Sequence, residues 1–109
     1  MTSHEELRVA LSTAPDADTG LRIARALVEE RLAACVNLVP AVRSVYRWEG
    51  RMQEDAEVLL VIKTRAARLD ALGERLRALH PYDLPELVAL PVTGGLAGYL
   101  AWVSGEVTP

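Results

Sequence analysis

Residues 35–64, CVNLVPAVRSVYRWEGRMQEDAEVLLVIKT, decide the fold because they predict a long β-hairpin. Cys35–Trp48 has the pattern of one strand with mostly apolar residues at even positions, and Gln53–Thr64 has that of a second strand centred on an unbroken apolar run. The Glu49-Gly50 pair between them is typical of a tight turn. Pro40 interrupts the first strand and predicts a bulge or an edge position, because proline cannot donate a ladder hydrogen bond.

The sequence before the hairpin predicts a strand followed by a helix. Leu7–Thr13 alternates between apolar and polar residues after a polar N-terminal tail, as expected of a strand. Apolar residues then recur at helical spacing, which predicts an amphipathic helix that is capped by Asp16 or Asp18 and runs to about Ala34. This helix is expected to cover a sheet.

The sequence after the hairpin predicts a helix, a strand and a short final helix. The second helix starts near Thr64, a plausible capping residue, and Pro81 stops it. Leu87–Val92 is wholly apolar, which predicts a strand that lies inside the sheet and is buried on both faces. A third helix follows Gly94-Gly95, with an apolar stripe made of Leu96, Tyr99, Leu100 and Val103.

This order predicts an α+β fold: a ferredoxin-like βαββαβ sandwich with a long hairpin and a short C-terminal helix, formed by residues 1–109 as a single domain. The fourteen-residue strand Cys35–Trp48 would span roughly 45 Å, whereas a compact domain of this length has a radius of gyration near about 13 Å. The hairpin should therefore overhang its own domain. Tyr46 and Trp48 on the overhang predict an interface between copies of the chain.

Composition excludes several classes of partner. Half of the residues are hydrophobic and the net charge is −3, which does not favour nucleic acid or an anionic membrane surface as a partner. No export signal or membrane-spanning stretch is evident, so we expect a cytoplasmic protein in which Cys35 is a reduced thiol. Nucleophile elbows, phosphate loops and dinucleotide fingerprints are absent, so we expect neither an enzyme nor an organic cofactor.

The segment His80–Glu86, HPYDLPE, holds the candidate functional side chains. Its two prolines make it rigid, and they place an imidazole, a phenol and two carboxylates between a helix and a strand. His80, Cys35 and Glu86 are candidate metal ligands whose thiolate and imidazole groups suit copper. A cysteine at a helix-to-strand junction is more often a small buried hydrophobe than a ligand, and His80 could simply cap its helix.

A polar pocket is the other hypothesis for this segment. Lys63 is the single lysine among twelve basic residues, and it is the natural partner for Glu86 at the start of a buried strand. Lys63, Tyr82, Trp48 and Glu86 would then line a ligand pocket, unless Lys63 and Glu86 form only a structural ion pair and the aromatic rings only pack at an interface.

Five separated blocks of the sequence resemble the CutA divalent-cation tolerance proteins. They are Arg31-Leu32-Ala33-Ala34-Cys35-Val36-Asn37 with Pro40, Ser44-x-Tyr46-x-Trp48-x-Gly50, Lys63-Thr64, His80-Pro81-Tyr82-x-x-Pro85-Glu86, and Gly95-x-x-x-Tyr99-Leu100-x-Trp102. The resemblance implies a ferredoxin-like protomer, a cytoplasmic homotrimer similar to the PII signalling proteins, and a role in tolerance of copper and other divalent metals. The alternative is a PII-like signalling or binding module that holds a small anion or metabolite in clefts between subunits.

Overall fold

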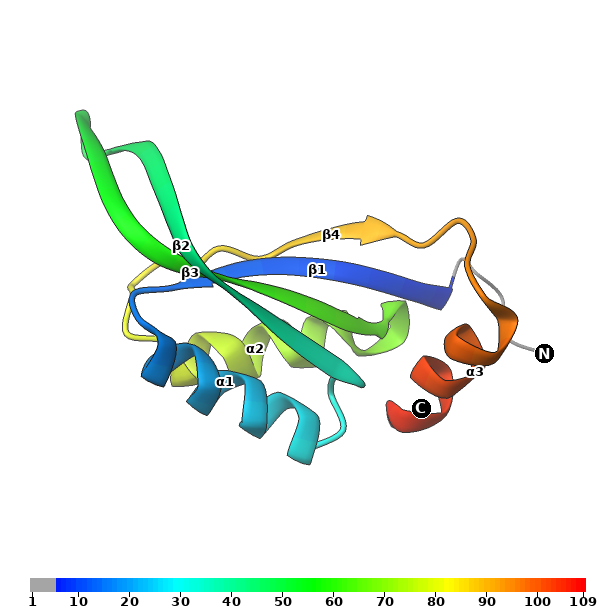
Figure 1. Cartoon of the computed structure of the whole chain (residues 1–109). Helices are drawn as coiled ribbons and strands as arrows, with labels where there is room; N and C mark the ends of the chain where they lie inside the picture. Colours follow the sequence, from blue (N-terminus) through cyan, green and yellow to red (C-terminus); the bar gives the residue numbers. More distant parts are fainter. Residues whose placement is uncertain (1–5) are drawn as a thin grey trace.

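The computed structural model describes residues 6–109 as one four-stranded sheet with three helices (Figure 1). The polar tail at residues 1–5 lies outside the described residues. In chain order the elements are β1 (Leu7–Ala14), α1 (Ala17–Glu29), β2 (Cys35–Trp48), β3 (Arg51–Arg65), α2 (Leu69–Leu79), β4 (Val88–Pro91) and α3 (Ala97–Glu106). The strand order is β2-β3-β1-β4 and every pair is antiparallel, which confirms the predicted ferredoxin-like α+β fold.

Helices α1 and α2 cover the same face of the sheet and leave the opposite face bare (Figure 1). The core fills the space between them with aliphatic side chains that are almost fully buried, among them Ile23, Leu27, Leu60, Ile62, Leu72 and Leu76. Asp16 caps α1, as the sequence predicted: its carboxylate accepts a 2.7 Å hydrogen bond from the Thr19 amide, and this bond lowers the pKa of Asp16.

The hairpin formed by β2 and β3 extends well past the rest of the molecule (Figure 1). It gives the chain principal extents of 47 × 25 × 22 Å, so the predicted overhang is confirmed. Glu49 and Gly50 both have positive φ, 51° and 78°, which is the backbone of a two-residue hairpin turn.

A bulge at Pro40 divides β2 into two halves whose even-numbered side chains lie on opposite faces of the sheet. Before the bulge Leu38 pairs with Leu60 on the helix-covered face, and after it Val42 pairs with Glu57 on the bare face. The predicted bulge is therefore confirmed, but the prediction that all even positions of the strand share one face is wrong. The extra residue carries Tyr46 and Trp48 to the bare face, because a one-residue shift reverses every following side chain.

Helix α1 ends at Glu29, five residues before the predicted end at Ala34. The chain leaves the helix through Arg31, whose φ of 59° is left-handed. The amides of Arg31 and Leu32 donate to the Val28 and Leu27 carbonyls at 3.0 and 2.9 Å, which is the Schellman closure of a helix end. No glycine marks this stop, so the apolar pattern alone placed it too late.

Thr64 does not cap the second helix, contrary to the prediction. It is fully buried in β3, where its hydroxyl donates a 2.7 Å hydrogen bond to the Leu32 carbonyl. β3 continues to Arg65, a short 3-10 turn follows at Ala66–Arg68, and α2 begins at Leu69. The helix ends at Leu79 before His80-Pro81, as predicted.

The prediction that the last strand lies inside the sheet and is buried on both faces is wrong. β4 is an edge strand, which suits Pro91, and its Val88 and Leu90 side chains are 52% and 53% exposed on the bare face. On the helix-covered side of β4, the apolar residues are explained by burial, because Ala89 packs on the core. On the bare side, the apolar side chains are not covered by any other part of residues 6–109.

Helix α3 packs across the far end of the sheet from the hairpin tip. Val103 and Val107 form a small second core with Leu7 and Ala34, while Tyr99 and Trp102 are about half exposed. Neither this helix nor any other in residues 6–109 is both long and apolar enough to cross a membrane.

Candidate functional site

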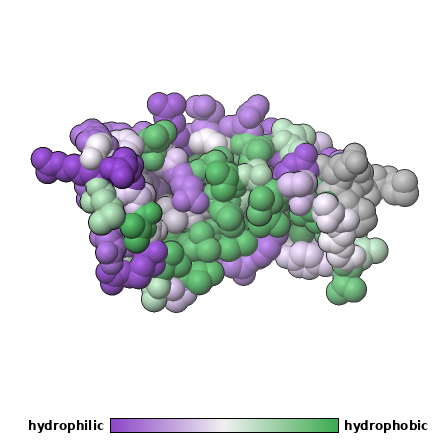
Figure 2. Space-filling model, turned by 90° about the horizontal axis from the view of Figure 1, so that it is seen from above, coloured by the Kyte–Doolittle hydropathy of each residue, from purple (hydrophilic) through white to green (hydrophobic). Residues whose placement is uncertain are grey.

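The bare face of the sheet is a broad apolar surface. Figure 2 looks down on this face and shows hydrophobic residues across its centre with hydrophilic residues around them. Val39, Val88 and Leu90, on the two edge strands, are 42%, 52% and 53% exposed. A face of this kind is typical of a surface that another protein chain covers.

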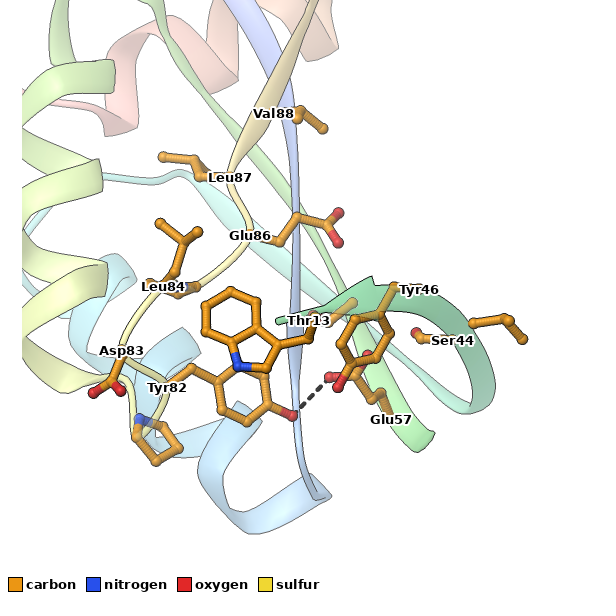
Figure 3. A pocket seen from close by; sticks show the side chains of 14 residues that line it. Thr13, Ser44, Tyr46, Glu57, Tyr82, Asp83, Leu84, Glu86, Leu87 and Val88 are labelled. Carbon is orange, nitrogen blue, oxygen red and sulfur yellow. Dashed lines mark hydrogen bonds between the residues drawn. The ribbon is translucent and has the colours of Figure 1, made fainter. Parts of the chain in front are cut away.

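A pocket of about 940 Å³ lies at one end of the bare face, where the hairpin overhang meets the segment between α2 and β4 (Figure 3). The hairpin contributes Ser44, Val45, Tyr46, Trp48 and Glu57, the segment contributes Pro81, Tyr82, Asp83, Leu84, Pro85, Glu86 and Leu87, and Thr13 and Val88 complete the lining. The two prolines restrict the backbone of this segment, which bends at residues 81–84 and brings these side chains against the hairpin.

Glu57 is the most buried charged group of the pocket, with 7% of the residue exposed. Its carboxylate accepts a 2.7 Å hydrogen bond from the Tyr82 hydroxyl, which points toward it in Figure 3. Burial and the hydrogen bond to this carboxylate raise the pKa of Tyr82, so the phenol stays protonated and remains the donor. The ion pairs found within residues 6–109 do not involve Glu57.

Glu86 supplies a second carboxylate at the rim of the pocket. Although the residue as a whole is exposed, packing around its carboxyl group raises its pKa, and the negative charge of Glu57 raises it further. Beside them the Tyr46 hydroxyl donates to Asp55 on the neighbouring strand, and this bond raises the pKa of Tyr46. The pocket therefore combines aromatic walls with negative charge.

His80 lies behind the pocket and is 8% exposed. Its Nε2 lies 2.7 Å from the Thr13 carbonyl, and its Nδ1 accepts a 3.1 Å hydrogen bond from the Tyr82 amide. These partners require a neutral ring with the proton on Nε2, which donates to Thr13. Both ring nitrogens are thus used to fasten the proline-containing segment to the end of β1, so coordination of a metal by His80 would require one of these bonds to break.

Cys35 and Lys63 lie together at the other end of the bare face. They are paired residues of β2 and β3, and both the Lys63 ammonium and the Cys35 thiol donate to the Asn37 side-chain oxygen. Tyr99 of α3 also contacts Cys35; burial, and then the charge and hydrogen bonding of this neighbour, raise the pKa of Tyr99.

The structure therefore divides the predicted site residues between two places. Tyr82, Trp48 and Glu86 line the pocket, and His80 lies behind it and contacts Tyr82. Strand pairing keeps Lys63 and Glu86 apart. Lys63 pairs with Val9 near the start of β1. Glu86 comes two residues before Val88, which pairs with Leu11 farther along the same strand.

Lys63 and Glu86 consequently do not form the predicted ion pair within one chain; Lys63 bonds to Asn37 instead. Cys35, His80 and Glu86 do not meet either, and no three acidic, cysteine or histidine side chains within residues 6–109 are placed to hold a metal ion. Residues 6–109 of one chain therefore bring together no group of three such ligands for copper. Sequence reasoning missed Glu57 as a pocket residue, although its acidic side chain at the edge of the apolar run of β3 was a usable signal.

The comparison with known proteins identifies the family. The sequence model described as "CutA1 divalent ion tolerance protein" matches residues 8–106. The divalent-cation tolerance protein CutA of Thermus thermophilus is 53% identical over 95 residues, which cover 87% of this chain and 92% of that protein. The chloroplastic protein CutA 1 of rice is 53% identical over 98 residues, which cover 90% of this chain and 55% of the rice protein, so the chain spans about half the length of that relative.

Solved structures agree with these sequence matches. The solved divalent cation tolerance protein of Thermus thermophilus superposes with a TM-score of 0.92 at 49% identity, covering 94% of this chain and 99% of that one. CutA1 of Oryza sativa gives a TM-score of 0.90 at 47% identity, covering 97% and 98% of the two chains. The chain belongs to the CutA1 divalent-ion tolerance family.

Proposed function

We propose that this chain acts in the cytoplasm as a homotrimer that binds, or responds to, copper and other divalent cations. The observation that carries the metal part is the match of residues 8–106 to the divalent-ion tolerance family. The family description names tolerance and no reaction, so we assign no catalytic residue. The rice and Arabidopsis relatives are described as chloroplastic, and fractionation of cells that express this chain tests the cytoplasmic location.

The bare face of the sheet supports the assembly. Val88 and Leu90 leave apolar surface in contact with water in the single chain, and burying such surface stabilises a complex by roughly 25 cal/mol per Å². The hairpin overhang projects past its own sheet and can lie along a neighbour, and three such contacts would close a ring. Sedimentation equilibrium should give three times the chain mass. A Leu90→Lys variant should weaken the assembly, whereas Val28→Lys, which changes an exposed apolar residue of α1 on the other side of the sheet, should not.

A site between chains would give a trimer more metal ligands in one place than residues 6–109 of one chain bring together. Cys35 and Glu86 lie at opposite ends of the bare face, and in a ring each end can lie next to a different copy. A thiolate and a carboxylate from neighbouring chains would then share one ion. His80 is already hydrogen-bonded within its own chain, so we place it as a support for the segment that carries Glu86.

Calorimetric titration of the metal-free protein with Cu(II), Cu(I) and Zn(II) tests the proposal. We expect saturable copper binding that Cys35→Ser weakens strongly and Glu86→Gln weakens to a lesser degree. Glu74→Gln, which removes an exposed carboxylate from α2, is the matched control. If copper binds no better than to an unrelated protein, or if Cys35→Ser and Glu74→Gln bind it equally well, the proposed site is wrong.

The PII-like alternative has one observation in its favour. The pocket is large enough for a metabolite and has three aromatic side chains, Tyr46, Trp48 and Tyr82. Its carboxylates do not favour an anion, and Lys63 is too far away to offset them within one chain. Titration with ATP and other nucleotides tests this alternative: saturable binding that Lys63→Ala abolishes would support an anion site formed between chains.

A further inference from the structure

The pocket between the hairpin and the proline-containing segment has a charge pattern that the metal proposal does not use. Three carboxylates line it, from Glu57, Asp83 and Glu86, and no arginine, lysine or histidine does so among residues 6–109. In Figure 3 Glu57 and Glu86 lie on the same side of Tyr82 while Asp83 points away from them. The carboxylates of Glu57 and Glu86 thus form the charged part of the pocket.

The charge of Glu57 is poorly compensated. A buried carboxylate usually pairs with a cation, because removing it from water costs several kcal/mol. Glu57 is 7% exposed, accepts a hydrogen bond from the neutral Tyr82 phenol, and takes part in no ion pair within residues 6–109. The neighbouring Glu86 adds like charge, which a bound cation would relieve.

The walls determine which kind of cation fits. The rings of Tyr46, Trp48 and Tyr82 offer faces that attract organic cations, and Leu84 and Leu87 add apolar surface. A volume of about 940 Å³ is far larger than a bare metal ion needs and lies within the range of pockets for small molecules. The described residues also fail to gather three metal ligands.

We propose that this pocket binds a small organic cation, with its ammonium or guanidinium group between Glu57 and Glu86 and its hydrocarbon part against Trp48 and Tyr82. Each N–H would donate a charge-assisted hydrogen bond to a carboxylate. The segment 81–87 presents Tyr82 and Glu86 without a large entropy loss on binding, because its prolines already fix the backbone. The inference does not depend on copper binding.

Fluorescence titration in the presence of a chelator tests this inference separately from the metal proposal. A Trp102→Phe background leaves Trp48 as the single tryptophan, and agmatine, which carries both an ammonium and a guanidinium group, serves as the probe. We expect a saturable change in Trp48 emission that weakens as salt is added, because the attraction is between opposite charges.

Isosteric variants show whether the carboxylates cause the binding. Glu57→Gln and Glu86→Gln keep the shape of the pocket, and each should weaken agmatine binding by roughly tenfold or more, which corresponds to the loss of one charge-assisted contact. Glu74→Gln should leave the affinity unchanged. N-butylurea, a neutral compound with a related shape, should bind much more weakly than agmatine.

Three outcomes would overturn the inference. One is equal binding of N-butylurea and agmatine, which would make the pocket merely apolar. Another is the same loss of affinity in Glu74→Gln as in Glu86→Gln, which would reduce the effect to net charge. The third is no agmatine binding by the assembled protein at low salt, which would mean that a side chain of a neighbouring copy already fills the pocket.

Discussion

Replacing His80 by alanine should destabilise the protein while leaving copper affinity nearly unchanged. The substitution removes two hydrogen bonds, from Nε2 to the Thr13 carbonyl at 2.7 Å and from the Tyr82 amide to Nδ1 at 3.1 Å. It also removes the contact between the imidazole and the Tyr82 ring, whose centroids are 4.6 Å apart. With about 0.5–1.5 kcal/mol for each hydrogen bond and a further cost for lost packing, we expect a loss of about 2–4 kcal/mol in the free energy of unfolding.

Two further variants separate the two bonds. His80→Asn places an amide oxygen near the position of Nδ1 and can still accept from the Tyr82 amide, whereas His80→Gln places an amide nitrogen near Nε2 and can still donate to Thr13. Each should lose about half as much stability as His80→Ala. Urea unfolding at one fixed protomer concentration is the assay, because assembly makes the apparent stability depend on concentration.

The opposite pattern would refute this reasoning. If His80→Ala unfolds at the same urea concentration as the parent protein but loses copper binding, the imidazole is a metal ligand rather than a fastening for the segment. If His80→Asn and His80→Gln are both as damaging as His80→Ala, the two hydrogen bonds are not the source of the stability.

Three other predictions concern separate elements. Because the pKa of Glu86 is raised in the folded chain, the folded state binds this proton more tightly than the unfolded state does, so stability should fall as pH rises above the ordinary pKa of 4.5. Glu86→Gln should flatten this fall when stability from urea unfolding is plotted against pH, and it should be the more stable form at about pH 7. The same pH dependence in the variant and the parent protein would contradict the assignment. Thr64→Val should lower the free energy of unfolding by about 1–3 kcal/mol, because it leaves the buried Leu32 carbonyl without its donor. Thr64→Ser keeps the hydroxyl and should lower it less. Equal urea midpoints for the two variants would argue against the bond. Gly50→Ala should lower the thermal midpoint, because φ of Gly50 is 78° and a residue with a Cβ is disfavoured there. Gly94→Ala, where an added Cβ meets no atom within 4 Å, serves as the control. Equal midpoints for the two variants would show that a side chain does not strain the turn.

The elements and their order followed from local patterns in the sequence. Long apolar runs in the hairpin, the Glu49-Gly50 turn and the proline stop after α2 act over a few residues, so they could be recognised without the fold. The errors came where a distant contact decided the outcome. Thr64 has the chemistry of a helix cap, yet the Leu32 carbonyl, 32 residues away in sequence, holds its hydroxyl inside the sheet.

The candidate site shows the same division. Its rigid segment was visible in the sequence, because Pro81 and Pro85 restrict the backbone wherever they occur. The side chains that this segment meets were not visible in the sequence. The bulge at Pro40 reverses the face on which the later residues of β2 lie, and so it brings Tyr46 and Trp48 to the face that holds Glu57. Strand register likewise placed Lys63 beside Asn37 rather than beside Glu86.

The sequence by itself determined the βαββαβ order, the overhanging hairpin and the rigidity of His80–Glu86, because periodicity, turn chemistry and proline geometry are properties of short stretches of chain. Only the tertiary structure decided that His80 fastens this segment to β1, that Glu57 is buried beside Tyr82, and that Cys35 and Lys63 lie at the far end of the sheet. The physical reason is strand register: hydrogen-bonded pairing between strands fixes which distant side chains meet, and a single bulged residue changes the face on which they do so.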